Sequence, residues 1–163
     1  MANYKRLFLN GYSYFITFVT YERNPILIDN IELLRQSFKH AKSKFVFDIK
    51  AITILPDHVH MIISVSNAKD YPKIMSTIKR YFSQKCDPSF YANVQQSASR
   101  EKQGYTPVWQ KRFYEHTIRD EKDYLEKIKY IDENPIKHGL TDTIDQWEYC
   151  SINYRSRCDH VTR

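Results

Sequence analysis

The chain has 163 residues, which suits a single domain with its own core, and its three glycines form no glycine-rich phosphate loop. We expect no membrane partner, because no apolar run is long enough to span a bilayer and no signal peptide opens the chain. The three cysteines are odd in number and lack metal-ligand spacing, which indicates a reduced, cytoplasmic protein. The formal net charge of +6 favours a polyanionic partner, nucleic acid before membrane, and nothing implies a protein partner.

β-Branched, aromatic and other apolar residues predict three strands, at 12–21, 45–55 and 58–65. Apolar residues at helical spacing predict a helix that Asp29 or Asn30 caps and that runs to about Ser43. A second helix is expected to open at Asp70 and to end near Cys86.

Residues 87–107 are polar and offer little that a core could bury, so we expect a mobile insertion loop at the surface. A binding role for this loop is the alternative. A fourth strand or extended segment is predicted at 108–118, followed by a helix that Asp120 caps. Pro135 is expected to stop this helix within the two residues before it, because a residue preceding proline disfavours the helical conformation.

The order of these elements, β-α-β-β-α-β-α, predicts the fold class. It indicates an α+β fold in one domain that spans residues 1–163, with helices covering one face of a mostly antiparallel sheet. No internal repeat and no linker divides the chain.

The strand at 58–65 carries two histidines next to a tight turn. Side chains alternate along a strand, so His58 and His60 share one face, whereas Val59 and Met61 share the other. Two imidazoles on one side of a rigid strand form half of a metal site. The alternative is a pair of polar residues at the rim of the sheet. Asp57 precedes them and is expected to point to the opposite face if the strand has already begun.

The helix after Asp120 has two distinct faces. Its apolar stripe comprises Tyr124, Ile128 and Ile131, whereas Tyr130 and Asn134 lie one turn apart on another side of the helix. A phenol is a possible nucleophile and an amide oxygen is a hard metal ligand. The alternative for Tyr130 is a half-buried packing role.

Three motifs in this order resemble those of the IS200-like tyrosine transposases, and most closely the REP-associated tyrosine transposases. The first is LPDHVHMI (55–62), which contains a His-hydrophobe-His signature. The second is WQKRFYEHTIR (109–119), and the third is YIDENPIKHGL (130–140). Trp147 and Ser151 resemble a further pair near the end of the family's sequences. The resemblance therefore covers nearly the whole chain.

The resemblance implies a ferredoxin-like antiparallel sheet with helices on one face and a C-terminal helix that carries the catalytic tyrosine. It implies that Tyr130 attacks a DNA phosphodiester, leaving a 5′-phosphotyrosine and a free 3′-OH. His58, His60 and Asn134 are then expected to bind Mg²⁺ or Mn²⁺. The implied substrate is single-stranded DNA with an imperfect hairpin of the repetitive extragenic palindrome (REP) type.

The basic residues expected to contact this DNA are Lys5, Arg6, Lys79, Arg80, Lys111, Arg112, Arg119 and Lys127. Two alternatives to a DNA strand transferase remain open. One is a domesticated protein that binds hairpin DNA without cutting it. The other is an unrelated hydrolase with zinc on His58 and His60, for which the sequence offers no obvious third ligand.

Overall fold

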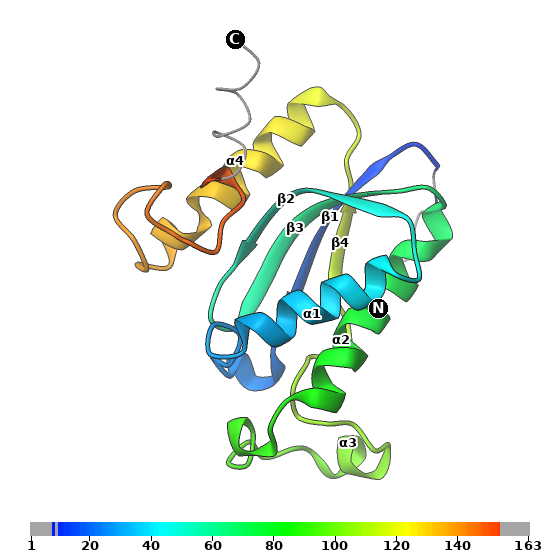
Figure 1. Cartoon of the computed structure of the whole chain (residues 1–163), viewed down its shortest axis with the longest axis vertical. Coiled ribbons are helices and arrows are strands. Elements are labelled where there is room, and N and C mark those ends of the chain that lie inside the picture. Colours follow the sequence, from blue (N-terminus) through cyan, green and yellow to red (C-terminus); the bar gives the residue numbers. More distant parts are fainter. Residues whose placement is uncertain (1–7, 9, 154–163) are drawn as a thin grey trace.

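The computed structural model describes Phe8 and residues 10–153 (Figure 1). Its strands are β1 (Ser13–Val19), β2 (Phe47–Ile54), β3 (His58–Val65) and β4 (Tyr114–Thr117). Its α-helices are α1 (Ile31–Lys42), α2 (Tyr71–Lys85), α3 (Ala98–Lys102) and α4 (Glu121–Lys137). Short 3-10 turns are η1 (Tyr21–Arg23), η2 (Ala68–Asp70) and η3 (Pro88–Phe90). None of the helices in this part of the chain is long and apolar enough to cross a membrane.

The strands form one sheet in the order β2-β3-β1-β4, and each neighbouring pair is antiparallel. The sheet confirms the predicted α+β fold with an antiparallel sheet. In one row across it, Thr17 of β1 pairs with His60 of β3 on one side and with Tyr114 of β4 on the other. The extended segment predicted at 108–118 pairs regularly only within β4, while Trp109 forms a single bridge to Thr20.

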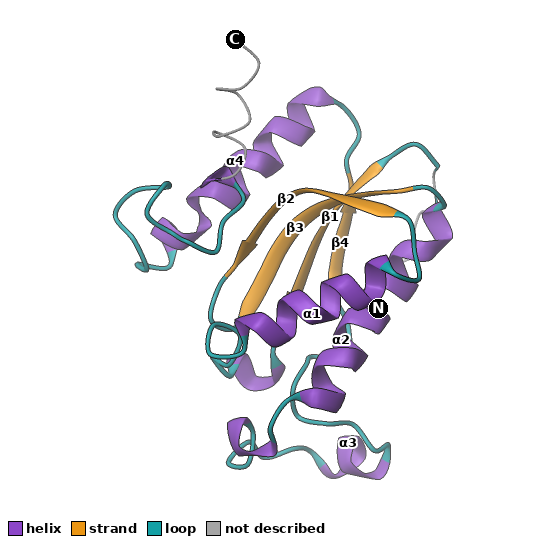
Figure 2. Ribbon diagram, in the orientation of Figure 1, coloured by secondary structure: helices purple, strands orange, loops and turns teal. Residues whose placement is uncertain are grey.

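Helices lie on both sides of the sheet (Figure 2). α1 and α2 cover one face, as expected, and pack on Ile16 and Phe18 of β1. α4 covers the other face, where Phe15 and Ile62 pack with Ile131. Successive side chains of a strand point to opposite faces, so β1 supplies residues to both cores. The tyrosine-bearing helix therefore lies across the sheet from α1 and α2.

α4 runs further than the sequence predicted. The side chain of Asp120 caps its first turn as expected, but the helix continues through Pro135 to Lys137. The expectation that Pro135 stops the helix is therefore wrong. Proline removes one N–H, and the last turn still closes because the backbone N–H of His138 donates to the carbonyl of Asn134 at 3.1 Å. This extension places two further basic residues beside the candidate site.

Residues 87–107 contain η3 and α3, which the sequence did not predict. Arg100 of α3 anchors the segment: its guanidinium carbon lies 4.1 Å from the ring centre of Tyr21, and its Nη2 donates to the carbonyl of Trp109 at 3.1 Å. The expected mobility of this segment stays a prediction. We expect trypsin to cut the free protein first after Arg100 or Lys102.

Replacing Arg100 with alanine is expected to speed trypsin cleavage after Lys102. The cation–π contact and the hydrogen bond together contribute on the order of 1–2 kcal/mol, so local opening should become roughly tenfold more frequent. A time course at low trypsin, read by mass spectrometry, measures this rate. Arg35→Ala, which removes a surface ion pair of α1, serves as the control. An unchanged rate after Lys102 would show that Arg100 does not hold the segment.

Candidate active site

β3 begins with the two histidines, and both lie on the face that α4 covers. The ring centres of His58 and His60 are 4.8 Å apart, and the two rings are nearly perpendicular. Only 3% of His58 and 5% of His60 is exposed. The alternation of strand residues predicted the shared face, but not this depth of burial, which arises because α4 packs over β3.

Each histidine is held by a partner at its Nδ1. Nδ1 of His58 donates to Oδ1 of Asp57 at 2.5 Å, and Oδ2 of Asp57 lies 3.3 Å from Nε of Arg23. Nδ1 of His60 lies 2.6 Å from Oγ1 of Thr17. These contacts orient the rings and leave Nε2 as the atom of each ring that can bind a ligand. Asp57 was expected to point to the opposite face only if the strand had already begun, and this condition is not met, because Asp57 belongs to the turn and β3 begins at His58.

Burial keeps both imidazoles neutral. It lowers the pKa of His58, and the hydrogen bond and negative charge of Asp57 oppose this shift only in part. Burial, together with the smaller effects of His58, His138, Arg23 and Lys137, lowers the pKa of His60 to about 3. Neutral imidazole is the form that binds a metal ion, so the two rings are ready for that role at neutral pH.

Tyr130 of α4 lies against the same part of the sheet. Its ring centre is 5.1 Å from that of His60 and 5.7 Å from that of Phe15, in both cases edge to face. The side chain is nevertheless 38% exposed, so solvent reaches it. The sequence placed Tyr130 off the apolar stripe of its helix, and the structure brings its ring beside His60 and Phe15. A phenol placed beside a buried histidine pair, yet open to solvent, can meet a reacting phosphate.

The extension of α4 past Pro135 adds two residues that the sequence analysis did not assign to the site. Nζ of Lys137 lies 4.7 Å from the ring centre of Tyr130, and the ring of His138 lies 4.9 Å from that of His58. Lys137 follows Tyr130 at seven residues, which is two helical turns along the same face. The sequence would have identified Lys137 by this spacing if the helix had been predicted to continue past Pro135.

Asn134, one turn after Tyr130, has an unusual environment. It is 1% exposed, and its Oδ1 has no hydrogen-bond partner among the described residues. A buried carbonyl oxygen without a donor is costly, and a bound cation would satisfy it. An amide oxygen and two neutral imidazoles fit Mg²⁺ or Mn²⁺, with water and substrate oxygens as the remaining ligands. Among the described residues, no group of three or more His, Cys, Asp or Glu side chains could hold a metal ion.

The basic residues predicted to bind DNA lie in separate places. Nζ of Lys127 is 5.2 Å from the ring centre of Phe15, beside Tyr130. Nε of Arg119 lies 3.4 Å from Oδ2 of Asp123 at the start of α4. A cavity beside α2 is lined by Lys79, Arg80, Lys111 and Arg112. Lys5 and Arg6 lie outside the described residues.

Comparison with known families shows which family the chain belongs to. The family model described as Transposase IS200 like matches residues 9–134, a span that includes both histidines, Tyr130 and Asn134. The chain belongs to the IS200-like transposase family. The match confirms the family that the three motifs predicted, and it places the chain among enzymes that act on DNA.

Relatives of this IS200-like transposase belong to the REP-associated group. A Haemophilus influenzae protein described as a REP-associated tyrosine transposase is 34% identical over 155 residues, which cover 94% of this chain and 86% of that protein. The Escherichia coli REP-associated tyrosine transposase is 28% identical over 155 residues, covering 94% and 84%. A solved structure of a REP-associated tyrosine transposase bound to a REP hairpin shares the fold, with a TM-score of 0.78, 28% identity and 94% and 84% coverage.

Proposed function

We propose that this IS200-like transposase cleaves and rejoins single-stranded DNA that carries a hairpin, with Tyr130 as the nucleophile. The observation that carries the proposal is the position of the phenol beside His60, one helical turn before the buried oxygen of Asn134. The solved relative bound to a REP hairpin supports the choice of DNA substrate.

The proposed reaction exchanges one phosphodiester for another. A bond forms between Oη of Tyr130 and the scissile phosphorus, while the bond from phosphorus to the 3′ oxygen breaks. The phenol loses a proton and the departing oxygen gains one, which yields a 5′-phosphotyrosine and a 3′-OH. The phosphotyrosine bond conserves the energy of the cleaved phosphodiester, so rejoining the DNA needs no ATP.

The residues of the site have distinct roles in this proposal. His58, His60 and Asn134 would hold Mg²⁺ or Mn²⁺, which when bound neutralises phosphate charge and orients the phosphate for attack. Lys137, above the ring of Tyr130, stabilises negative charge as the phenol loses its proton. Asp57 and Thr17 fix the histidine rings from their Nδ1 sides.

A hairpin-binding protein without cleavage is the second candidate, and the relative bound to a REP hairpin is compatible with it. Incubation of the protein with a labelled REP hairpin strand and Mg²⁺ or Mn²⁺ separates the two. Cleavage products and a covalent adduct support the transferase, whereas tight binding without either product supports the binder. The zinc-hydrolase alternative requires a third His, Cys or carboxylate ligand, and metal analysis by mass spectrometry tests for zinc.

DNA binding is expected to fall steeply with salt and to persist without metal. Each Lys or Arg that neutralises a phosphate releases counterions, so hairpin affinity should drop by about a thousandfold between roughly 50 and 200 mM salt. Chelation of divalent cations should change affinity by no more than about threefold, because the charge of the protein itself attracts the DNA. Fluorescence anisotropy titrations measure both effects. A flat salt response would contradict this prediction.

Lys137→Ala is expected to slow adduct formation by about tenfold, since a single cation near developing charge contributes on the order of 1–2 kcal/mol. Lys137→Arg should recover most of the rate, and hairpin affinity should change little in either variant. Lys129→Ala is the matched control, because the ammonium group of Lys129 on the same helix pairs with Glu133 at 3.7 Å, whereas the cation over the ring of Tyr130 is Lys137. Equal rates for both alanine variants would remove Lys137 from the site.

A further inference from the structure

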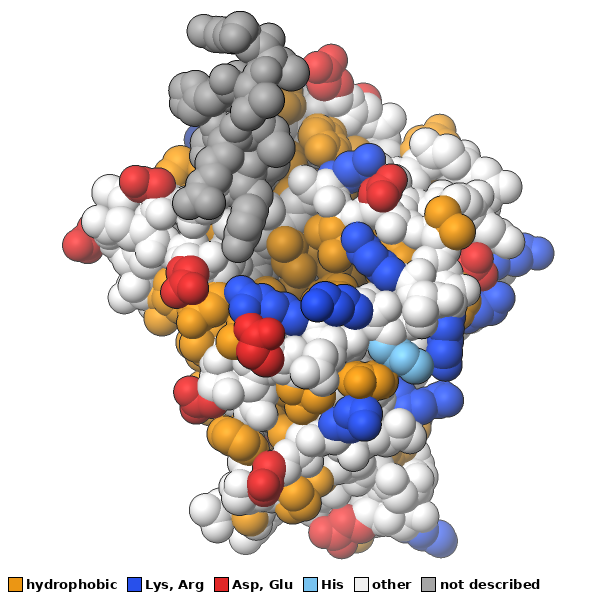
Figure 3. Space-filling view, in the orientation of Figure 1, with side chains coloured by type: hydrophobic (Ala, Val, Ile, Leu, Met, Phe, Trp, Pro, Cys, Tyr) orange, Lys and Arg blue, Asp and Glu red, His pale blue; other side chains and the backbone are white. Residues whose placement is uncertain are grey.

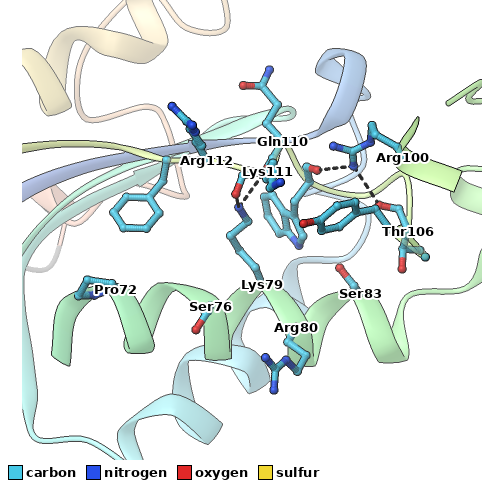
Figure 4. A pocket seen from close by; sticks show the side chains of 14 residues that line it. Pro72, Ser76, Lys79, Arg80, Ser83, Arg100, Thr106, Gln110, Lys111 and Arg112 are labelled. Carbon is cyan, nitrogen blue, oxygen red and sulfur yellow. Dashed lines mark hydrogen bonds between the residues drawn. The ribbon is translucent and has the colours of Figure 1, made fainter. Parts of the chain in front are cut away.

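Cations that contact DNA next to Tyr130 must lie near the face of the sheet that α4 covers. The basic cavity beside α2 is on the opposite face, where Lys79 reaches across it and donates to the carbonyl of Gln110 at 2.6 Å (Figure 4). Acidic and basic side chains are interspersed on the face that α1 covers (Figure 3). The general distribution of surface charge therefore does not show how a strand passes Tyr130, and the charged residues beside the histidine pair are more informative.

A strained turn between β1 and α1 carries one such residue, Arg23. Glu22 and Arg23 have φ angles of 52° and 58°, in the left-handed region that residues other than glycine rarely adopt. Among the described residues, no other non-glycine residue has a positive φ. Backbone strain of this kind persists where the surrounding contacts impose it, and it is frequent at active sites and ligand-binding sites. The strain therefore indicates that the position of this turn has a function.

Hydrogen bonds on both sides of the strained turn hold it against the turn that precedes the two histidines. Before it, the backbone N–H and the hydroxyl of Thr20 donate to the carbonyl of Asp57 at 2.8 and 3.0 Å. After it, the backbone N–H of Leu27 donates to the carbonyl of Pro56 at 2.9 Å. These bonds fix the strained turn next to the first residue of β3, and they place the side chain of Arg23 there.

The guanidinium of Arg23 is only partly occupied by the protein. Its Nε lies 3.3 Å from Oδ2 of Asp57, whose Oδ1 accepts a hydrogen bond from Nδ1 of His58. A single carboxylate oxygen cannot bind all five N–H donors of a guanidinium, and the described residues supply no other ion pair to this group. The side chain is 52% exposed, so solvent reaches the remaining donors. A guanidinium with free donors is well matched to a DNA phosphate.

Arg23 and Tyr130 lie at opposite ends of the histidine pair. The ring centre of Tyr130 is 5.1 Å from that of His60, which is 4.8 Å from that of His58. Arg23 follows His58 through the carboxylate of Asp57. Burial is the main cause of the lowered pKa of each histidine, and the positive charge of Arg23 contributes to both shifts. A phosphate beside the two rings would therefore have the phenol at one end and a cation at the other.

We propose that Arg23 binds a backbone phosphate of the DNA segment that ends in the 3′-OH after cleavage. This inference rests on the proposed function, because it takes Tyr130 as the nucleophile. The attacking and departing oxygens of a phosphoryl transfer lie roughly in line, on opposite sides of the phosphorus. The 3′ oxygen therefore departs on the side away from Tyr130, and its strand runs past His58 to Arg23. The contact keeps this strand beside the phosphotyrosine, where its 3′-OH can attack the phosphorus and restore the DNA.

A scan of the DNA phosphates tests this contact. A fluorescein-labelled REP hairpin strand is prepared in versions that each carry one methylphosphonate, which removes the charge of a single linkage. Each version is titrated by fluorescence anisotropy against the wild type, Arg23→Gln and Arg35→Gln, with divalent cations chelated so that the strand stays intact. Arg35 is the matched control, because it is an exposed, ion-paired arginine of α1, on the other face of the sheet.

One linkage is expected to lose its effect on binding in Arg23→Gln. Neutralising it should weaken binding to the wild type and to Arg35→Gln by about fivefold, because a cation and a phosphate form one interaction. Binding to Arg23→Gln should weaken by less than about 1.5-fold, since the cation is already absent. Cleavage of the unmodified strand with Mg²⁺ or Mn²⁺ should place this linkage in the segment that ends in the 3′-OH.

Two results would overturn the proposal. One is a coupled linkage in the segment joined to Tyr130. The other is the absence of coupling at every linkage, which would restrict Arg23 to orienting Asp57 and His58 even if Arg23→Gln forms the adduct more slowly. A coupled linkage in a wild-type protein that forms no adduct would support the phosphate contact while refuting the proposed cleavage.

A second measurement covers the case in which Arg23→Gln does not fold. Phenylglyoxal modifies exposed arginines, and mass spectrometry measures its rate at Arg23 in the wild-type protein. The hairpin strand should slow this modification by at least about fivefold, because a bound phosphate occupies the guanidinium. An unchanged rate in the presence of saturating strand would overturn the contact.

Discussion

Replacing Tyr130 with phenylalanine is expected to abolish the covalent protein–DNA adduct while leaving hairpin affinity within about twofold of the wild type. The phenyl ring can keep its edge contacts with His60 and Phe15 and its contact with Lys137, so the local packing remains. The change removes the hydroxyl alone. Denaturing gel electrophoresis of a labelled hairpin strand, incubated with protein and Mg²⁺ or Mn²⁺, measures the adduct.

The matched control is Tyr114→Phe. Tyr114 lies on the same face of the sheet, with its ring centre 6.3 Å from that of Phe15, and it is more exposed than Tyr130. Its variant should keep the adduct at about the wild-type level. If the adduct survives in Tyr130→Phe and disappears in Tyr114→Phe, the nucleophile is Tyr114 and the proposed mechanism fails. Tyr124 is the remaining candidate if both variants keep the adduct.

Much of the fold and the centre of the site could be predicted because both depend on short-range patterns. Alternation along β3 placed His58 and His60 on one face, and helical spacing placed Asn134 one turn after Tyr130. Each inference uses the periodicity of one element. The family motifs then linked these elements, although they are far apart in the sequence.

The sequence analysis missed some residues of the site because a local rule of secondary structure has an exception at their positions. A proline usually ends a helix, but Pro135 lies near the end of α4, where the last turn closes with backbone donors from later residues. Lys137 and His138 therefore lie beside the site, although a helix that ended before Pro135 would not position them. Likewise, Asp57 contacts His58 because it lies in a turn, where strand alternation does not apply.

The burial of the histidines could not be predicted from periodicity. The exposed fraction of a strand residue depends on which helix packs over it, and the position of α4 across the sheet from α1 and α2 is a long-range feature. The strand pattern alone places the two imidazoles on one face, and it does not indicate that their removal would affect folding. Their actual burial changes what their removal should do.

His58→Ala and His60→Ala are each expected to abolish cleavage and also to lower the melting temperature by several degrees. Truncation of His60 removes its contact with the Thr17 hydroxyl and its stacking on Phe15, and truncation of His58 removes the partner of the Asp57 carboxylate. Each loss should cost about 1–3 kcal/mol of folding free energy, which corresponds to several degrees in a protein of this size. Calorimetry and the adduct assay on the same samples measure the two effects.

His116→Ala separates loss of chemistry from loss of stability. His116 lies on β4, where its Nε2 donates to Oδ2 of the buried Asp123 at 2.8 Å. Its removal should lower the melting temperature by a similar amount, because it also takes a partner from a buried carboxylate. It should nevertheless leave cleavage near the wild-type rate at a temperature well below melting. If His116→Ala loses cleavage as completely as His60→Ala, stability explains both results. If His60→Ala cleaves normally, His60 is not a ligand of the proposed metal and the site has to be reassigned.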